Sequence, residues 1–94
     1  MASNNPPTRP SPEALRAEIL RQTAARGDAA SICPSEVARA LFPEEHWRSL
    51  MTPIRQEAMK LQAAGQIEIL RKGKPVPAEE VRGVIRLRAA RPGE

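Results

Sequence analysis

Aromatic residues and cysteines are scarce in this 94-residue sequence, which contains one Trp, one Phe, no Tyr and one Cys. The core must therefore consist of aliphatic side chains, which suits a few helices and a small sheet and argues against a ligand-filled barrel. The single cysteine, Cys33, has no partner for an internal disulfide, so nothing in the sequence indicates an oxidising compartment.

Long apolar runs are also missing. No run approaches the roughly 20 residues that a membrane-spanning helix needs. The N-terminus is polar and proline-rich and lacks the apolar core of a signal peptide. We therefore expect a cytoplasmic protein that makes no membrane contact.

The residue patterns that catalysis or metal binding requires are lacking as well. The sequence contains no Ser-His-Asp order, no glycine-rich phosphate loop and no paired catalytic carboxylates. Cys33 has no CxxC partner, and the single histidine, His46, cannot complete a four-ligand metal site with it. We expect a protein that is not an enzyme and that holds no metal and no cofactor.

Positive charge is unevenly distributed along the chain. Residues 1–46 carry five basic and six acidic side chains, whereas residues 47–94 carry ten basic and five acidic ones. This excess favours an anionic partner, and nucleic acid is a common one for a small basic domain. The alternative explanation is a general bias of composition, because Arg outnumbers Lys by twelve to three.

One domain is expected over residues 11–90, with disordered tails at residues 1–10 and 91–94 that lack apolar periodicity. Ser11-Pro12-Glu13 has the features of a helix start, namely a hydroxyl N-cap, Pro in the first turn and an acidic side chain. Gly27 is expected to end this helix.

The middle of the chain predicts a short strand and a second helix. Residues 29–33 suit a small strand, and Pro34 begins a helix that Pro43 stops. Residues 44–51 then form either a short helix of their own or part of one helix over residues 44–64, kinked at Pro53. The sequence leaves these two alternatives open.

The second half of the chain predicts a helix followed by a hairpin. Thr52 is expected to cap a helix over residues 53–64, and Gly65 to end it. Alternating apolar residues on either side of Lys72-Gly73-Lys74-Pro75 predict two strands. The expected fold is mainly α with a small β-hairpin. It is a winged helix-turn-helix of three to four helices and a two- to three-stranded antiparallel sheet.

Several residue groups carry a resemblance to a known family. They are Ile32-Cys33-Pro34-Ser35-Glu36-Val37-Ala38-Arg39-Ala40-Leu41, then Trp47-Arg48 with Leu50-Met51, and then Gly65 with Ile67 and Lys72-Gly73 with Pro75-Val76. Together, over residues 13–88, they resemble a small bacterial family catalogued as domain-of-unknown-function family 3253. The resemblance implies a winged-helix fold. It implies no established activity and assigns no catalytic residues.

The helix over residues 53–64 would present polar side chains to a DNA major groove, where Arg can bind guanine and Gln can bind adenine. The basic loop at residues 71–75 would follow the phosphate backbone. The predicted DNA-binding residues are Arg48, Thr52, Arg55, Gln56, Lys60, Arg71, Lys72 and Lys74. The alternative for all of them is an ordinary solvated surface, and Trp47 is expected to be buried.

The sequence thus predicts a non-enzymatic domain that binds double-stranded DNA, with transcriptional regulation as one role. The alternative is a protein–protein adaptor whose exposed apolar patch consists of Phe42, Met51 and Met59. A continuous positive face would favour DNA, whereas interruption by acidic side chains would favour the adaptor. Those acidic residues are Glu57, Glu68, Glu79 and Glu80. The oligomeric state, the DNA sequence and any effector stay open.

Overall fold

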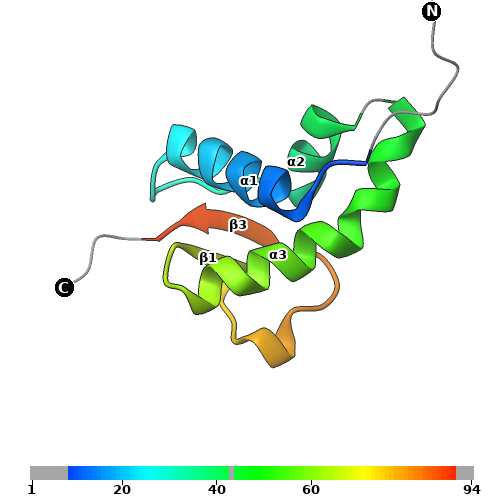
Figure 1. Ribbon diagram of the computed structural model, residues 1–94. Coiled ribbons are helices and arrows are strands. Elements are labelled where there is room, and N and C mark those ends of the chain that lie inside the picture. Colours follow the sequence, from blue (N-terminus) through cyan, green and yellow to red (C-terminus); the bar gives the residue numbers. More distant parts are fainter. Residues whose placement is uncertain (1–8, 43, 91–94) are drawn as a thin grey trace, which may run out of the picture.

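The computed structural model describes residues 9–42 and 44–90. The elements, in chain order, are α1 (Pro12–Arg26), α2 (Pro34–Leu41), the 3-10 helix η1 (Glu44–Leu50), α3 (Met51–Ala63), β1 (Ile67–Arg71), β2 (Lys74–Pro75), the 3-10 helix η2 (Ala78–Glu80) and β3 (Arg86–Ala89). The described chain is mainly helical with one three-stranded antiparallel sheet, which confirms the expected fold class at this level (Figure 1).

The sheet has the order β2-β1-β3, so β1 is its central strand. Ile69 pairs with Leu87 across β1 and β3, and the side chains of both are buried. The predicted strand at residues 29–33 is reduced to a single antiparallel bridge. Ile32 and Leu87 exchange two backbone hydrogen bonds of 2.8 Å. This bridge fixes the connection between α1 and α2 to the outer edge of β3.

The first helix follows its capping signals. The Ser11 hydroxyl accepts a hydrogen bond from the backbone N–H of Ala14 at 3.1 Å, and Gly27 follows Arg26 with a φ of 77°. That positive φ favours glycine. A stripe consisting of Leu15, Ile19 and Thr23 is buried, so the helix packs one face onto the core.

Of the two alternatives for residues 44–64, the structure has a short helix of its own, η1 (Glu44–Leu50), followed directly by α3 (Met51–Ala63). The η1 helix leads into α3 without an extended residue, because Leu50 at the junction has φ −89° and ψ −8°. Figure 1 shows this segment as one bent ribbon. The expectation that Thr52 caps the helix is wrong, since α3 begins at Met51 and Thr52 lies exposed in its first turn.

The core is aliphatic, as the composition requires. It joins α1, α2, α3 and the sheet. Its fully buried members include Leu15, Ile19, Ile32, Val37, Leu50, Ile54, Ile69 and Leu87. Trp47 is half-buried against this core, and Phe42 is buried.

The expected disordered tails fall almost entirely outside the described residues. Only Arg9 and Pro10 of residues 1–10 are described, and none of residues 91–94 is. The Arg9 guanidinium donates a hydrogen bond of 2.6 Å to the Ser49 carbonyl, so this part of the chain contacts η1. Within residues 9–42 and 44–90, no helix has both the length and the hydropathy of a membrane span.

Candidate nucleic-acid interface

The exposed ridge of α3 is polar but carries little unpaired charge. Thr52, Gln56 and Ala63 are exposed along it, and Met59 beside them is half-buried. The rotation of the helix therefore agrees with the predicted outward face. The basic residues of the helix lie on the flanks of this ridge, where they engage neighbouring parts of the protein.

Arg55 differs from its expected state. Its side chain is half-buried, and its guanidinium donates a hydrogen bond to the backbone carbonyl of Gly83. Arg55 thus ties α3 to the loop that precedes β3, and it is not the freely exposed side chain that the helix periodicity predicts. The cause is tertiary, because Gly83 is brought to α3 only when the chain returns to form β3.

Lys60 is exposed, and its ammonium lies 3.3 Å from a carboxylate oxygen of Glu57. Glu57 was expected on the surface, but only 5% of it is exposed. The second Glu57 oxygen lies 2.5 Å from the Arg16 guanidinium of α1. Burial raises the pKa of the Glu57 carboxyl, but hydrogen bonds from Arg16 and Lys60 and their charges outweigh it, so the pKa lies below its ordinary value.

The burial of Glu57 has a signal in the sequence. Ile54 and Leu61, which flank it at spacings of three and four residues, belong to the buried stripe of α3. A charged residue at such a position requires a partner of opposite sign. Arg16 supplies it from 41 residues away, a distance over which the sequence gives no pairing information.

The β1–β2 hairpin carries basic side chains on a tight turn. Lys72 and Gly73 have φ values of 55° and 82°, and Arg71 pairs directly with Lys74 across the two strands. Positive φ at both central residues is the geometry of a two-residue type I′ hairpin turn. Lys72 and Lys74 are exposed and Arg71 is half-buried. None of the three has a side-chain hydrogen bond to the described residues.

Gln62 fastens this hairpin to α3. Its amide oxygen accepts a hydrogen bond of 2.7 Å from the Ile69 N–H, and its amide nitrogen donates one of 3.1 Å to the Val76 carbonyl. The Val76 N–H in turn donates to the Ile69 carbonyl at 3.0 Å. The Gln62 side-chain amide thus takes the place of a second backbone hydrogen bond between these two residues, which would run from the Ile69 N–H to the Val76 carbonyl. The basic turn is held in a fixed position relative to α3.

The acidic residues that would interrupt a positive face fall into two pairs. The negative charge of Glu57 is balanced by Arg16 and Lys60. Glu68 on β1 accepts a hydrogen bond from Arg88 on β3, with 3.0 Å between Nε and Oε1. Glu79 and Glu80 in η2 are exposed. Of these four acidic side chains, Glu79 and Glu80 are the two that have no salt bridge to the described residues.

Arg48, the last of the predicted contact residues, is exposed on η1. Its guanidinium carbon lies 4.6 Å from the centroid of the Trp47 ring, and that of Arg39 from α2 lies 4.5 Å from the same centroid. Arg39 is not among the contact residues predicted from the sequence. No local signal identifies it, because α2 and η1 meet only in the folded protein.

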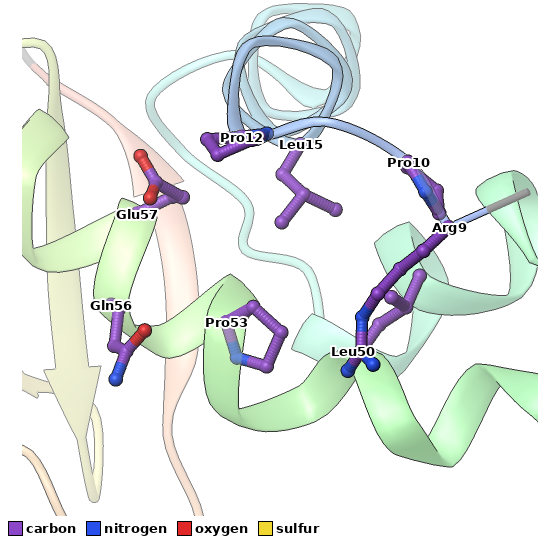
Figure 2. A pocket seen from close by; sticks show the side chains of 8 residues that line it. All are labelled: Arg9, Pro10, Pro12, Leu15, Leu50, Pro53, Gln56 and Glu57. Carbon is purple, nitrogen blue, oxygen red and sulfur yellow. The ribbon is translucent and has the colours of Figure 1, made fainter.

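Two hollows adjoin the N-terminal half of α3. One, of about 210 Å³, is lined by Arg9, Pro10, Pro12, Leu15, Leu50, Pro53, Gln56 and Glu57. Figure 2 shows the prolines and leucines of this hollow between the chain leading into α1 and the start of α3. Its one carboxylate, Glu57, is already paired with Arg16 and Lys60. The hollow is thus mainly apolar.

The other hollow, of about 270 Å³, lies between α3 and the loop before β3 and is lined by Cys33, Pro34, Met51, Arg55, Gly83, Val84 and Ile85. Val84 is 84% exposed and is the one large apolar side chain recorded as exposed in the described chain. The expected apolar patch of Phe42, Met51 and Met59 is wrong, because Phe42 is buried and both methionines pack against the core.

Comparison with known proteins identifies the family. Residues 12–90 match the model of the family described as protein of unknown function (DUF3253). The protein belongs to this family. The match covers all the described secondary structure and confirms the resemblance drawn from the sequence. No curated protein matches the chain. Membership of DUF3253 assigns no binding or catalytic residue.

Across residues 9–42 and 44–90, no three His, Cys, Asp or Glu side chains are grouped so that they could hold a metal ion. Cys33 is half-buried, and its sulfur accepts a hydrogen bond of 3.1 Å from the Ser35 hydroxyl.

Proposed function

We propose that this protein is a winged-helix domain that binds double-stranded DNA, with α3 in the major groove and the wing at residues 71–75 along the phosphate backbone. The observation that carries the proposal is the basic turn at Lys72 and Lys74. It is exposed, it has no partner among the described residues, and the two strands that lead to it are both hydrogen-bonded to Gln62 of α3. Transcriptional regulation is one role that such binding would serve.

The order of the elements supports the winged-helix part of the proposal. Three α-helices and the 3-10 helix η1 precede a hairpin, and Ile32, between α1 and α2, bridges to β3. A helix that enters the major groove and a basic hairpin that contacts the backbone are established ways of binding DNA. The η1 helix would take the place of the tight turn in a minimal helix-turn-helix.

The predicted residues take different roles in this proposal. Thr52 and Gln56 are exposed, and their side chains make no hydrogen bond to the described residues, so they are free to contact base edges. Arg55 uses part of its guanidinium on Gly83, and its remaining N–H groups suit a phosphate better than a base. Lys60 shares its charge with Glu57 and is expected to contribute little.

Fluorescence anisotropy of a labelled mixed-sequence duplex, titrated with salt, tests the proposal. Binding should weaken with salt, with a log–log slope of about −3 or steeper if three or more phosphates are contacted. The Lys72→Ala/Lys74→Ala variant should bind more weakly and lower that slope by about two. The control is Arg21→Ala/Arg26→Ala, which removes the same charge from exposed positions on α1. No binding at low salt by the folded protein would refute the proposal.

A second function, a protein–protein adaptor, is favoured by Val84 and the hollow beside it. Val84 and the hollow, which Pro34, Met51 and Ile85 also line, together offer an apolar surface that would suit a contact with another protein. Affinity capture with the wild-type protein and with Val84→Asp tests this reading. A partner that is retained by the wild type and lost with Val84→Asp, in the absence of DNA binding, would favour the adaptor.

A further inference from the structure

Two guanidinium groups share one indole ring at the corner where α2 meets η1. Arg39 and Arg48 lie 4.5 Å and 4.6 Å from the Trp47 ring centroid. The ring is half-buried and packs against the core, which fixes its position. Phe42 and His46, whose ring centroids are 5.2 Å apart, form the other part of this corner. The single Phe and the single Trp of the protein, Phe42 and Trp47, therefore both belong to this corner.

The indole leaves the hydrogen-bonding edges of both guanidinium groups available. A stacked guanidinium uses its flat face on the ring, while its N–H groups point outward in its own plane. Arg39 and Arg48 are exposed, and neither has a side-chain hydrogen bond to the described residues, whereas Arg55, Arg86 and Arg88 are all bonded. Stacking also restricts the side chains before binding, which reduces the entropy that binding would cost.

The spacing of the two groups suits neighbouring phosphates. Because both lie over the same ring, their guanidinium carbons are no farther apart than the sum of the two distances to its centroid. Successive phosphates of one strand advance by about 3.4 Å along the duplex axis and also rotate about it, so they lie farther apart than this rise, and two groups as close as these can reach neighbouring phosphates. Each phosphate can accept two parallel N–H bonds from one guanidinium.

The corner also lies where a second backbone contact is useful. Arg48 precedes Met51, the first residue of α3, by three positions, and η1 runs directly into that helix. The hairpin follows the other end of α3 and carries the wing (Figure 1). Backbone contacts at two separate elements fix the orientation of a helix in the groove, whereas one contact leaves it free to rotate.

We propose that Arg39, Trp47 and Arg48 form a clamp for two backbone phosphates of the bound duplex. The inference rests on the proposed DNA binding and adds a contact that is independent of the wing. Because each guanidinium would bind one phosphate through two parallel N–H groups, binding at the clamp depends on the paired geometry of the guanidinium groups rather than on charge alone.

Charge-preserving variants test this dependence on geometry. In the anisotropy titration, Arg39→Ala/Arg48→Ala should weaken binding about tenfold or more and lower the salt slope by about two. Arg39→Lys/Arg48→Lys keeps both charges but cannot stack and bind phosphate bidentately, so it should weaken binding about threefold or more. Binding by the Lys variant equal to that of the wild type would overturn the clamp, since charge alone would then suffice.

Intrinsic fluorescence supplies an independent readout, because Trp47 is the single tryptophan. Unlabelled duplex should change the emission of Trp47 in the wild type and also in Lys72→Ala/Lys74→Ala at higher DNA concentration. Anisotropy that reports binding while the emission of Trp47 stays constant would overturn the clamp and leave the proposed function standing. If the wild-type protein shows no DNA binding in either measurement, the proposed function itself is refuted. Circular dichroism of each variant verifies that it is folded.

Discussion

Arg16 of α1 and Glu57 of α3 form an ion pair, with Nη1 2.5 Å from Oε1, at the boundary between the core and the surface. The carboxylate is buried and the guanidinium is about one-third exposed. Lys60 contacts the other carboxylate oxygen. This pair joins the first helix to the helix that we propose for the DNA groove, so the position of α3 depends on it.

Replacement of Glu57 by Gln should destabilise the protein by about 1–3 kcal/mol at pH 7, because Arg16 loses a charged partner. The lowered pKa of Glu57 decides the pH dependence. Its stabilisation is complete above the unfolded-state pKa, which is about 4.3 for glutamate, and is lost as the pH falls through the lower folded-state pKa. The difference between wild type and variant should therefore shrink below about pH 4.

Urea unfolding at pH 7 and pH 3, followed by circular dichroism, measures this difference. Glu79→Gln is the matched control, since Glu79 is exposed on η2. Equal unfolding free energies of Glu57→Gln and the wild type at pH 7 would show that the Arg16–Glu57 ion pair does not stabilise the protein.

Gln62→Leu should destabilise the protein by about 1–3 kcal/mol, because the Ile69 N–H and the Val76 carbonyl both lose a partner. Gln62→Glu keeps the acceptor for Ile69 but loses the donor to Val76, so an intermediate loss is expected. Hydrogen exchange at the Ile69 amide measures the effect at the bond itself. Unchanged protection of that amide in Gln62→Leu would contradict the bridging role.

Lys72→Asn should stabilise the hairpin by about 0.5 kcal/mol, because asparagine tolerates a φ of 55° better than lysine does. The same change removes a proposed phosphate contact, so DNA affinity should fall while stability rises. Lys74→Asn is the control, since it removes the same charge from a strand position. Thermal melting and the salt titration together separate the two effects. A DNA affinity unchanged in both variants would exclude the basic turn from the interface.

Two neighbouring residues just before β3, Val84 and Ile85, should respond differently to truncation. Val84→Ser removes an exposed side chain and should change the unfolding free energy by no more than about 0.5 kcal/mol. Ile85→Ala empties a core position and should cost about 2–4 kcal/mol. Chemical denaturation of both variants checks the alternation, and a cost for Val84→Ser as large as that for Ile85→Ala would show that Val84 has a structural role.

Local sequence signals determined most of the fold. Ser11 and Gly27 bound the first helix as their capping chemistry predicts, and the alternation of Ile85 and Leu87 places β3 in the core. These features depend on residues within one turn of helix or one strand, so their energetics can be read from adjacent positions. The exposed ridge of α3 follows from the same periodicity.

Tertiary structure decided which side chains remain available for a partner. Arg55 turns to Gly83, Glu57 is buried beside Arg16, and Arg39 meets Trp47. Each of these contacts joins separate elements of the chain, and the residues next to either partner in the sequence do not indicate which residue it will contact. A pattern of charges in the sequence therefore locates the basic half of the protein. Only the packing of α1, α2 and the loop before β3 around α3 determines which of those charges stay free.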